Sequence, residues 1–109
     1  MPISNHAKGV RNEFLAKQVL KSDGYLVEQK NWSRYAPKDF FSLFDILAIR
    51  LDEVRFIQIK SDKSSFYKAR KDVANWVFLN NISPKIKCEV WLKENRTPWR
   101  IECVNELQN

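Results

Sequence analysis

Three polar residues interrupt two strongly apolar segments in the middle of the chain, and their chemistry suits a bound cation. Asp45 lies within residues 43–50, while Gln58 and Lys60 lie within residues 54–60. Hard divalent cations take carboxylate and amide oxygens as ligands, and a lysine beside them can orient water or offset negative charge. Because an unpaired polar group in a buried segment is costly, we expect these residues to pair with one another or with a cation.

The two segments that carry these residues are predicted to be neighbouring antiparallel strands. Both are rich in β-branched and aromatic residues, and the short break between them, Leu51-Asp52-Glu53, suits a turn. Side chains alternate along a strand, so Gln58 and Lys60 lie on one face of the second strand. The sheet therefore brings an acid on one strand close to an amide and a lysine on the next.

A helix, a strand and a long loop are predicted before these strands. The helix covers residues 8–21, and Ser4 or Asn5 can cap its start. Its apolar residues recur with helical spacing: Val10, Phe14, Leu15, Val19 and Leu20. The strand covers residues 25–30 and the loop residues 31–42.

A second helix and a final pair of strands are predicted after them. The helix covers residues 66–80 and is capped by Ser64 or Ser65. Its inward stripe is Phe66, Ala69, Val73, Trp76, Val77 and Asn80. The strands cover residues 86–93 and 99–104.

A turn at Asn95 and Arg96 would place Cys88 opposite Cys103 in this last hairpin. Free thiols are the expected state in a reducing cytoplasm, although a hyperthermophilic source would favour a disulfide. Together with His6, the only histidine, these cysteines form no recognisable zinc pattern.

The order α-β-β-β-α-β-β predicts an α/β (α+β) protein, with a mixed five-stranded sheet flanked by helices. At 109 residues, the chain is expected to form one domain over residues 1–109. No apolar run approaches the length of a membrane span, and the first residues lack the apolar core of a signal peptide. We therefore expect a cytoplasmic protein.

The charge of the chain favours a polyanionic partner. Nineteen Lys and Arg residues against thirteen Asp and Glu residues give a net charge of +6. The solvated surface of a thermophilic protein could have a similar balance.

The spacing of three polar residues resembles the motif of the PD-(D/E)XK nuclease superfamily. Twelve residues separate Asp45 from Gln58, and one residue separates Gln58 from Lys60. Gln58 stands where Glu or Asp is usual, as in Mrr-like restriction enzymes, and Phe44 stands where Pro is usual. Residues 8–104 are most similar to archaeal Holliday junction resolvases, including the basic, glycine-containing segment before Glu13. The resemblance implies a restriction-endonuclease-like fold, a DNA endonuclease that uses Mg²⁺ with Mn²⁺ as a substitute, and a homodimer acting on branched DNA.

The resemblance also implies roles for individual residues. The metal ligands would be Glu13, Asp45, Gln58 and the main-chain carbonyl of Ile59. Lys60 would activate the attacking water, and Ser33 or alternatively Ser42 would be the functionally important serine of the long loop. Taken alone, Glu13 also suits a solvated acid near the favourable end of a helix dipole.

Contacts to DNA are expected from the two helix starts and the long loop. The candidates are Lys8, Arg11, Trp32, Arg34, Tyr35, Lys38, Lys63, Lys68, Arg70 and Lys71. Interleaved aromatic and basic residues suit phosphates and unstacked bases, although Trp32 and Tyr35 would equally serve to anchor the loop. Cations in the first turns of the second helix oppose its dipole, which favours phosphate contact over a merely solvated face.

Two other functional classes fit the same residues. One is a non-catalytic nucleic-acid-binding module on a degenerate nuclease fold, for which the Gln58 substitution is the main argument. The other is a structural protein in which Asp45 and Lys60 form a buried ion pair beside Gln58.

Overall fold

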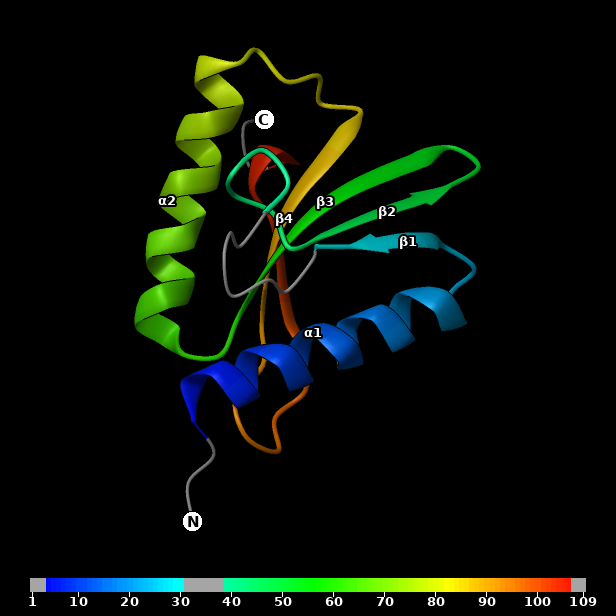
Figure 1. Cartoon of the computed structure of the whole chain (residues 1–109). Helices are drawn as coiled ribbons and strands as arrows, with labels where there is room; N and C mark the ends of the chain where they lie inside the picture. Colours follow the sequence, from blue (N-terminus) through cyan, green and yellow to red (C-terminus); the bar gives the residue numbers. More distant parts are fainter. Residues whose placement is uncertain (1–3, 31–38, 107–109) are drawn as a thin grey trace.

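The helices and strands follow one another in the order that the sequence predicts (Figure 1). The computed structural model describes residues 4–30 and 39–106. Its elements are α1 (Asn5–Ser22), β1 (Leu26–Gln29), β2 (Ile46–Arg50), β3 (Glu53–Lys60), α2 (Lys63–Leu79), β4 (Ile86–Leu92), β5 (Arg100–Cys103) and a short 3-10 helix, η1 (Val104–Glu106).

The five strands form one mixed sheet in the order β1-β2-β3-β4-β5. Every neighbouring pair is antiparallel except β3 and β4, which run parallel and pair Gln58 with Val90. A parallel pair needs a crossover, and α2 supplies it between β3 and β4. The predicted mixed sheet of five strands is confirmed.

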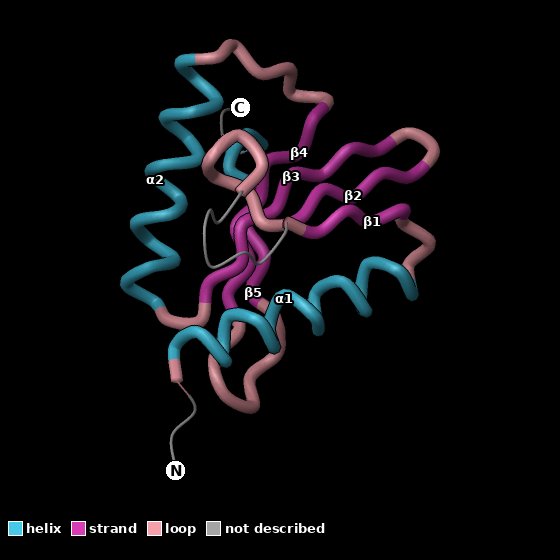
Figure 2. The backbone as a smooth tube through the Cα atoms, viewed as in Figure 1, coloured by secondary structure: helices cyan, strands magenta, loops and turns pink. Residues whose placement is uncertain are grey.

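The two helices cover opposite faces of this sheet (Figure 2). Ala16 and Leu20 of α1 pack with Trp91, whereas Val73 of α2 packs with Val90. Because Val90 and Trp91 are consecutive residues of β4, they point to opposite faces. β4 is therefore buried on both faces along its second half, where Val90, Trp91 and Leu92 follow one another.

The buried face of α1 differs from its apolar stripe. Three of the five apolar residues that mark the stripe are exposed, namely Val10, Phe14 and Val19, and Phe14 keeps 55% of its surface. The helix instead turns Asn12 and Glu13 inward, ahead of its small and apolar contacts with the sheet. Asn12 and Glu13 have polar partners in the segments that follow β1, β3 and β4, and these contacts set which face of α1 meets the sheet.

The helix caps are only partly as expected. Ser4 caps α1 and accepts a hydrogen bond from Ala7 N at 3.1 Å. The cap of α2 is Asp62, so the prediction of Ser64 or Ser65 is wrong. Asp62 Oδ1 accepts from Ser65 N and from Ser64 Oγ, both at 2.8 Å, because a carboxylate is the stronger acceptor for the free amides of a helix start. The inward stripe of α2 is buried except for the partly buried Trp76 and the exposed Asn80.

The last hairpin pairs Glu89, not Cys88, with Cys103, so the predicted cysteine pairing is wrong. Thr97 N donates to Glu94 O at 3.3 Å, which places the turn where it was expected. The strands are nevertheless shifted by one residue after the turn, beside Pro98, which has no N–H for the ladder. No disulfide joins Cys88 and Cys103, and burial raises the pKa of Cys88 to about 12.

None of the described helices is long and apolar enough to cross a membrane.

Candidate active site

Asp45 lies directly before β2 and is 6% exposed. Its main-chain N–H donates to Ile57 O at 2.9 Å, and its side-chain Oδ2 accepts the N–H of Ile59 at 2.7 Å. The carboxylate thus satisfies the Ile59 amide at the end of the β2–β3 ladder. Because the N–H and C=O of one strand residue point the same way, the Ile59 carbonyl faces this side of β3 as well.

Lys30, the first residue after β1, brings three carboxylates together. Its ammonium nitrogen lies 2.7 Å from Asp45 Oδ1, 3.0 Å from Asp39 Oδ1 and 3.5 Å from Glu13 Oε2. Its main-chain N–H also donates to Asp45 O at 2.9 Å. We call Glu13, Asp39 and Asp45 the acidic cluster. One buried ammonium serves all three of its carboxylates.

The electrostatics of the acidic cluster keep Lys30 charged. Burial alone would lower the pKa of Lys30, but the hydrogen bond and charge of Asp45, together with Asp39 and Glu13, raise this pKa above its ordinary value. Burial raises the pKa of the Asp45 carboxyl, whereas the Ile59 N–H and Lys30 act to lower it. Burial therefore disfavours the charged form of Asp45, and the Ile59 hydrogen bond and the Lys30 ion pair offset part of that cost.

Glu13 reaches the acidic cluster from the first half of α1. It is 3% exposed, and Gln29 Nε2 donates to its Oε1 at 3.4 Å. The neighbouring Asn12 fixes the helix by donating to Ser61 Oγ at 2.9 Å and to Lys93 O at 3.2 Å. Glu13 is therefore not a solvated helix acid.

The other two motif residues have fewer partners. The Gln58 Oε1 atom is buried and accepts no hydrogen bond within the described part of the chain. Lys60 is half-buried and makes no ion pair with the residues that the structure describes. The alternative in which Asp45 and Lys60 form a buried ion pair is therefore wrong, because Asp45 pairs with Lys30 instead.

The donor chemistry of this region fits a hard divalent cation. Glu13 and Asp45 supply nearly buried carboxylates, and Gln58, the residue before the Ile59 that Asp45 contacts, carries an amide oxygen without a partner in the described chain. Oxygen donors are the preference of Mg²⁺. No three His, Cys, Asp or Glu side chains of residues 4–30 and 39–106 are already arranged to hold a metal ion. The carboxylates are instead arranged around the Lys30 ammonium.

Comparison with solved structures identifies the architecture that holds these residues. A chain of Hjc, a Holliday junction resolvase from the archaeal hyperthermophile Archaeoglobus fulgidus, superposes with a TM-score of 0.60 and 20% sequence identity, covering 89% of this chain and 73% of that one. This chain has the restriction-endonuclease-like fold. No protein-family model and no curated protein matches the sequence.

On this restriction-endonuclease-like fold, the basic candidates of α2 differ in how far they are already paired. Lys68 Nζ lies 3.0 Å from Asp72 Oδ2, and Arg70 Nε lies 2.6 Å from Glu102 Oε2. Lys63 and Lys71 are exposed and have no ion pair among the described residues. The latter two are the stronger candidates for phosphate contact.

The remaining DNA candidates fall into two groups. Lys8 and Arg11 lie on the first half of α1, which the Asn12–Ser61 hydrogen bond holds close to the start of α2. The loop candidates Trp32, Ser33, Arg34, Tyr35 and Lys38 lie outside the described residues, whereas the alternative serine, Ser42, is exposed.

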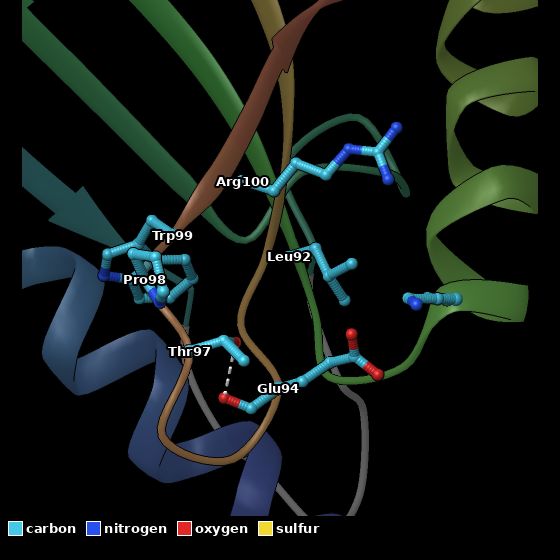
Figure 3. Close-up of a pocket in the computed structure, with 7 residues that line it drawn as sticks. Leu92, Glu94, Thr97, Pro98, Trp99 and Arg100 are labelled. Carbon is cyan, nitrogen blue, oxygen red and sulfur yellow. Dashed lines mark hydrogen bonds between the residues drawn. The ribbon is translucent and has the colours of Figure 1, made fainter.

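A separate cavity of about 310 Å³ opens between the start of α2 and the β4–β5 connection (Figure 3). It is lined by Lys63, Leu92, Glu94, Thr97, Pro98, Trp99 and Arg100. Thr97 Oγ1 donates to Glu94 O at 3.0 Å and steadies the loop that forms its rim. Sequence patterning contains no signal for this cavity, because its walls come from three separate segments.

Two residues of the site, Lys30 and Asp39, were missed from the sequence. Lys30 ends a predicted strand and Asp39 lies in the predicted loop, and neither belongs to a recognisable motif. The available signal was a lysine at the end of a strand next to one carrying a buried acid, since a buried acid needs a cation.

Proposed function

We propose that this chain is a metal-dependent DNA endonuclease that hydrolyses phosphodiester bonds, with branched DNA as its preferred substrate. The observation that carries this proposal is the gathering of three carboxylates, two of them nearly buried, on the Lys30 ammonium, together with the unpartnered oxygen of Gln58, the residue before Ile59. Clusters of buried, interacting charges are typical of sites that bind or react. The nuclease-like fold, which is shared with Hjc, agrees with this assignment.

Each motif residue then has a defined task. Asp45 would bind the metal through Oδ1, because its Oδ2 is already held by the Ile59 N–H. Gln58 Oε1, the Ile59 carbonyl and Glu13 would complete the protein ligands. When bound, Mg²⁺, or Mn²⁺ in its place, neutralises charge on the scissile phosphate and makes water a stronger nucleophile.

Lys60 would act on water and phosphate rather than on the metal. Its ammonium is half-buried and makes no ion pair within the described residues, so its charge is available to a ligand. It would orient the attacking water and offset the negative charge that grows on the phosphate.

The proposed substrate rests on charge, on symmetry and on the likeness to Hjc. The net charge of +6 favours DNA, and Hjc is a Holliday junction resolvase. A two-fold symmetric homodimer would place one site on each of two opposed strands of a junction. Phosphates would be contacted by Lys8, Arg11, Lys63 and Lys71. Bases exposed at the branch would stack on Trp32 and Tyr35, which lie in the same loop as Ser33.

A cleavage panel tests this function. Four-way junction, flap, single-stranded and plain duplex DNA would each be incubated with Mg²⁺, Mn²⁺ or EDTA, using Lys60→Ala as the matched inactive control. We expect metal-dependent cleavage by the wild type, strongest on the junction, and none by Lys60→Ala. Cleavage that persists in EDTA or in Lys60→Ala would contradict the assigned chemistry.

Binding measurements test the substrate separately. We expect a dimer in solution by light scattering, and tighter binding to a four-way junction than to a duplex of the same sequence. Trp32→Ala combined with Tyr35→Ala should weaken junction binding more than duplex binding. A monomer with equal affinity for both DNAs would remove the branched substrate but leave the nuclease chemistry.

A non-catalytic DNA-binding module is the second candidate function. It is favoured by the lysine already paired with Asp45 and by the amide in place of the usual second acid. Salt-dependent DNA binding without cleavage of any of the four DNAs would support this candidate over the first.

A further inference from the structure

We propose that Lys30 and a divalent metal ion are alternative counter-ions for the acidic cluster, so that the metal binds only when the Lys30 ammonium leaves. This inference deepens the proposed nuclease function and rests on it. It assigns a role to a residue outside the Asp45, Gln58 and Lys60 motif.

The acidic cluster gathers three carboxylates around one described ammonium. Glu13 and Asp45 are 3% and 6% exposed, and the Lys30 side chain keeps only 10% of its surface. Buried carboxylates need positive partners, and Lys30 is the cation that contacts all three acids of this cluster. A dication would bring two positive charges to the place where the ammonium brings one, so the same carboxylates suit either counter-ion.

Lys30 and a metal ion would compete for one oxygen atom. Asp45 Oδ2 already accepts the Ile59 N–H, which leaves Oδ1 as the oxygen that faces a cation. Lys30 holds this same Oδ1 at 2.7 Å. Mg²⁺ would bind the oxygen at about 2.0–2.1 Å, so the two cations would lie within a few ångströms of each other and repel strongly. Their simultaneous presence is disfavoured.

The Lys30 side chain has the freedom to move that this exchange requires. The Lys30 main chain is fixed by its hydrogen bond to Asp45 O, but four flexible methylenes separate it from the ammonium. Rotation about these bonds can withdraw the charge without disturbing β1. The Gln58 oxygen, which has no partner in the described residues, would gain one when the metal replaces the ammonium.

Metal binding in the absence of DNA tests the exchange. Calorimetric titration with Mg²⁺ alone would compare the wild type, Lys30→Met and Lys85→Met, the last of which removes the same charge from an exposed lysine just before β4. We expect Lys30→Met to tighten Mg²⁺ binding by about tenfold or more, because a competent state populated at about 10% or less weakens apparent affinity by that fraction. Lys85→Met should change the affinity by less than about twofold, since Lys85 precedes β4 at the end opposite to Leu92 and Lys60, and exposed charges at a distance are screened.

A second measurement uses the wild-type protein, because Lys30→Met leaves buried carboxylates unpaired and can prevent folding. The ¹⁵N signal of the Lys30 ammonium, assigned by its absence from the Lys30→Met spectrum or otherwise through its side-chain carbons, should shift or vanish as Mg²⁺ is added. If Lys30→Met does not fold, this spectrum decides alone, and a Lys30 signal unchanged at saturating Mg²⁺ overturns the inference.

The outcomes separate this inference from the proposed function. Equal Mg²⁺ affinity in the wild type and Lys30→Met, with metal-dependent cleavage intact, overturns the exchange but not the nuclease. Absence of Mg²⁺ binding in both proteins overturns both proposals. Binding by Lys30→Met alone overturns the exchange and contradicts the nuclease, because Lys30 would then block the site permanently in the wild type.

Discussion

Two groups of buried charges lie in the same sheet, and they are built differently. Arg55 and Glu89 form a pair with Arg55 Nη2 2.7 Å from Glu89 Oε1, and Trp91 Nε1 also donates to this oxygen at 2.9 Å. The Arg55 guanidinium lies 5.2 Å from the ring centres of both Tyr25 and Trp91. This pair has one acid, one base and aromatic walls.

The acidic cluster has the opposite character. Its three carboxylates share the Lys30 ammonium, and the amide oxygen of Gln58 has no partner in the described chain. A balanced pair is complete without a ligand, whereas an unbalanced group leaves charge for a ligand to neutralise. Charge balance, rather than burial alone, therefore distinguishes a structural ion pair from a candidate reactive site.

Asp45→Asn should separate activity from stability at the unbalanced site. We expect cleavage to fall to background, because the main proposed metal ligand loses its charge. The fold should persist, since Lys30 keeps Glu13 and Asp39 as partners. Cleavage assays and thermal unfolding would be measured on the same sample, and simultaneous loss of fold and activity would point to a purely structural role.

Glu89→Gln, at the Arg55–Glu89 pair, should reduce stability and leave activity unchanged. Breaking a buried ion pair leaves Arg55 unpaired and should reduce the free energy of unfolding by about 3–5 kcal/mol, as measured by urea denaturation. Cleavage per folded molecule should be unchanged at a temperature where the variant is folded. The double variant Arg55→Met with Glu89→Leu is the control, and it should recover much of the missing stability.

Gln58→Glu should increase the charge imbalance of the acidic cluster. The added charge should tighten Mg²⁺ binding by roughly tenfold, equal to about 1.4 kcal/mol, as measured by calorimetry without DNA. Gln58→Leu is the matched control and should weaken binding. A folded Gln58→Glu variant with unchanged Mg²⁺ affinity would mean that this side chain contacts something other than the metal.

Surface charges should give the smallest effects. Lys63→Gln or Lys71→Gln should flatten the salt dependence of DNA binding by about 0.9 for each phosphate that the variant no longer neutralises. Arg70→Gln should change this slope less, because Glu102 already pairs with the guanidinium. Equal slopes for all three variants and the wild type would mean that the start of α2 is an ordinary solvated surface without phosphate contacts.

The sequence predicted the architecture well because the signals for it are local. Strand alternation and helical spacing indicated the element order, and the apolar segments around Asp45 and Gln58 indicated the paired central strands. The position of Glu13 on the first helix was also predicted, and its burial is now observed.

What the sequence could not predict depends on distant partners. Lys30 reaches Asp45 across the long segment between β1 and β2, and no local spacing fixes how those strands align. The rotation of α1 follows from Asn12 and its contacts with Ser61 and Lys93, so the apolar stripe is misleading there. A shift of one residue beside Pro98 was enough to pair Cys103 with Glu89 instead of Cys88.

The two outer strands of the sheet have a consequence for assembly. β1 and β5 are each only four residues long, and they carry charged side chains, Glu28 on one and Arg100 and Glu102 on the other. Short, charged edges discourage another strand from pairing and so protect a protein from aggregation. The proposed homodimer should therefore form through helices or loops instead of extending the sheet, and hydrogen exchange at β1 and β5 should not change when it forms.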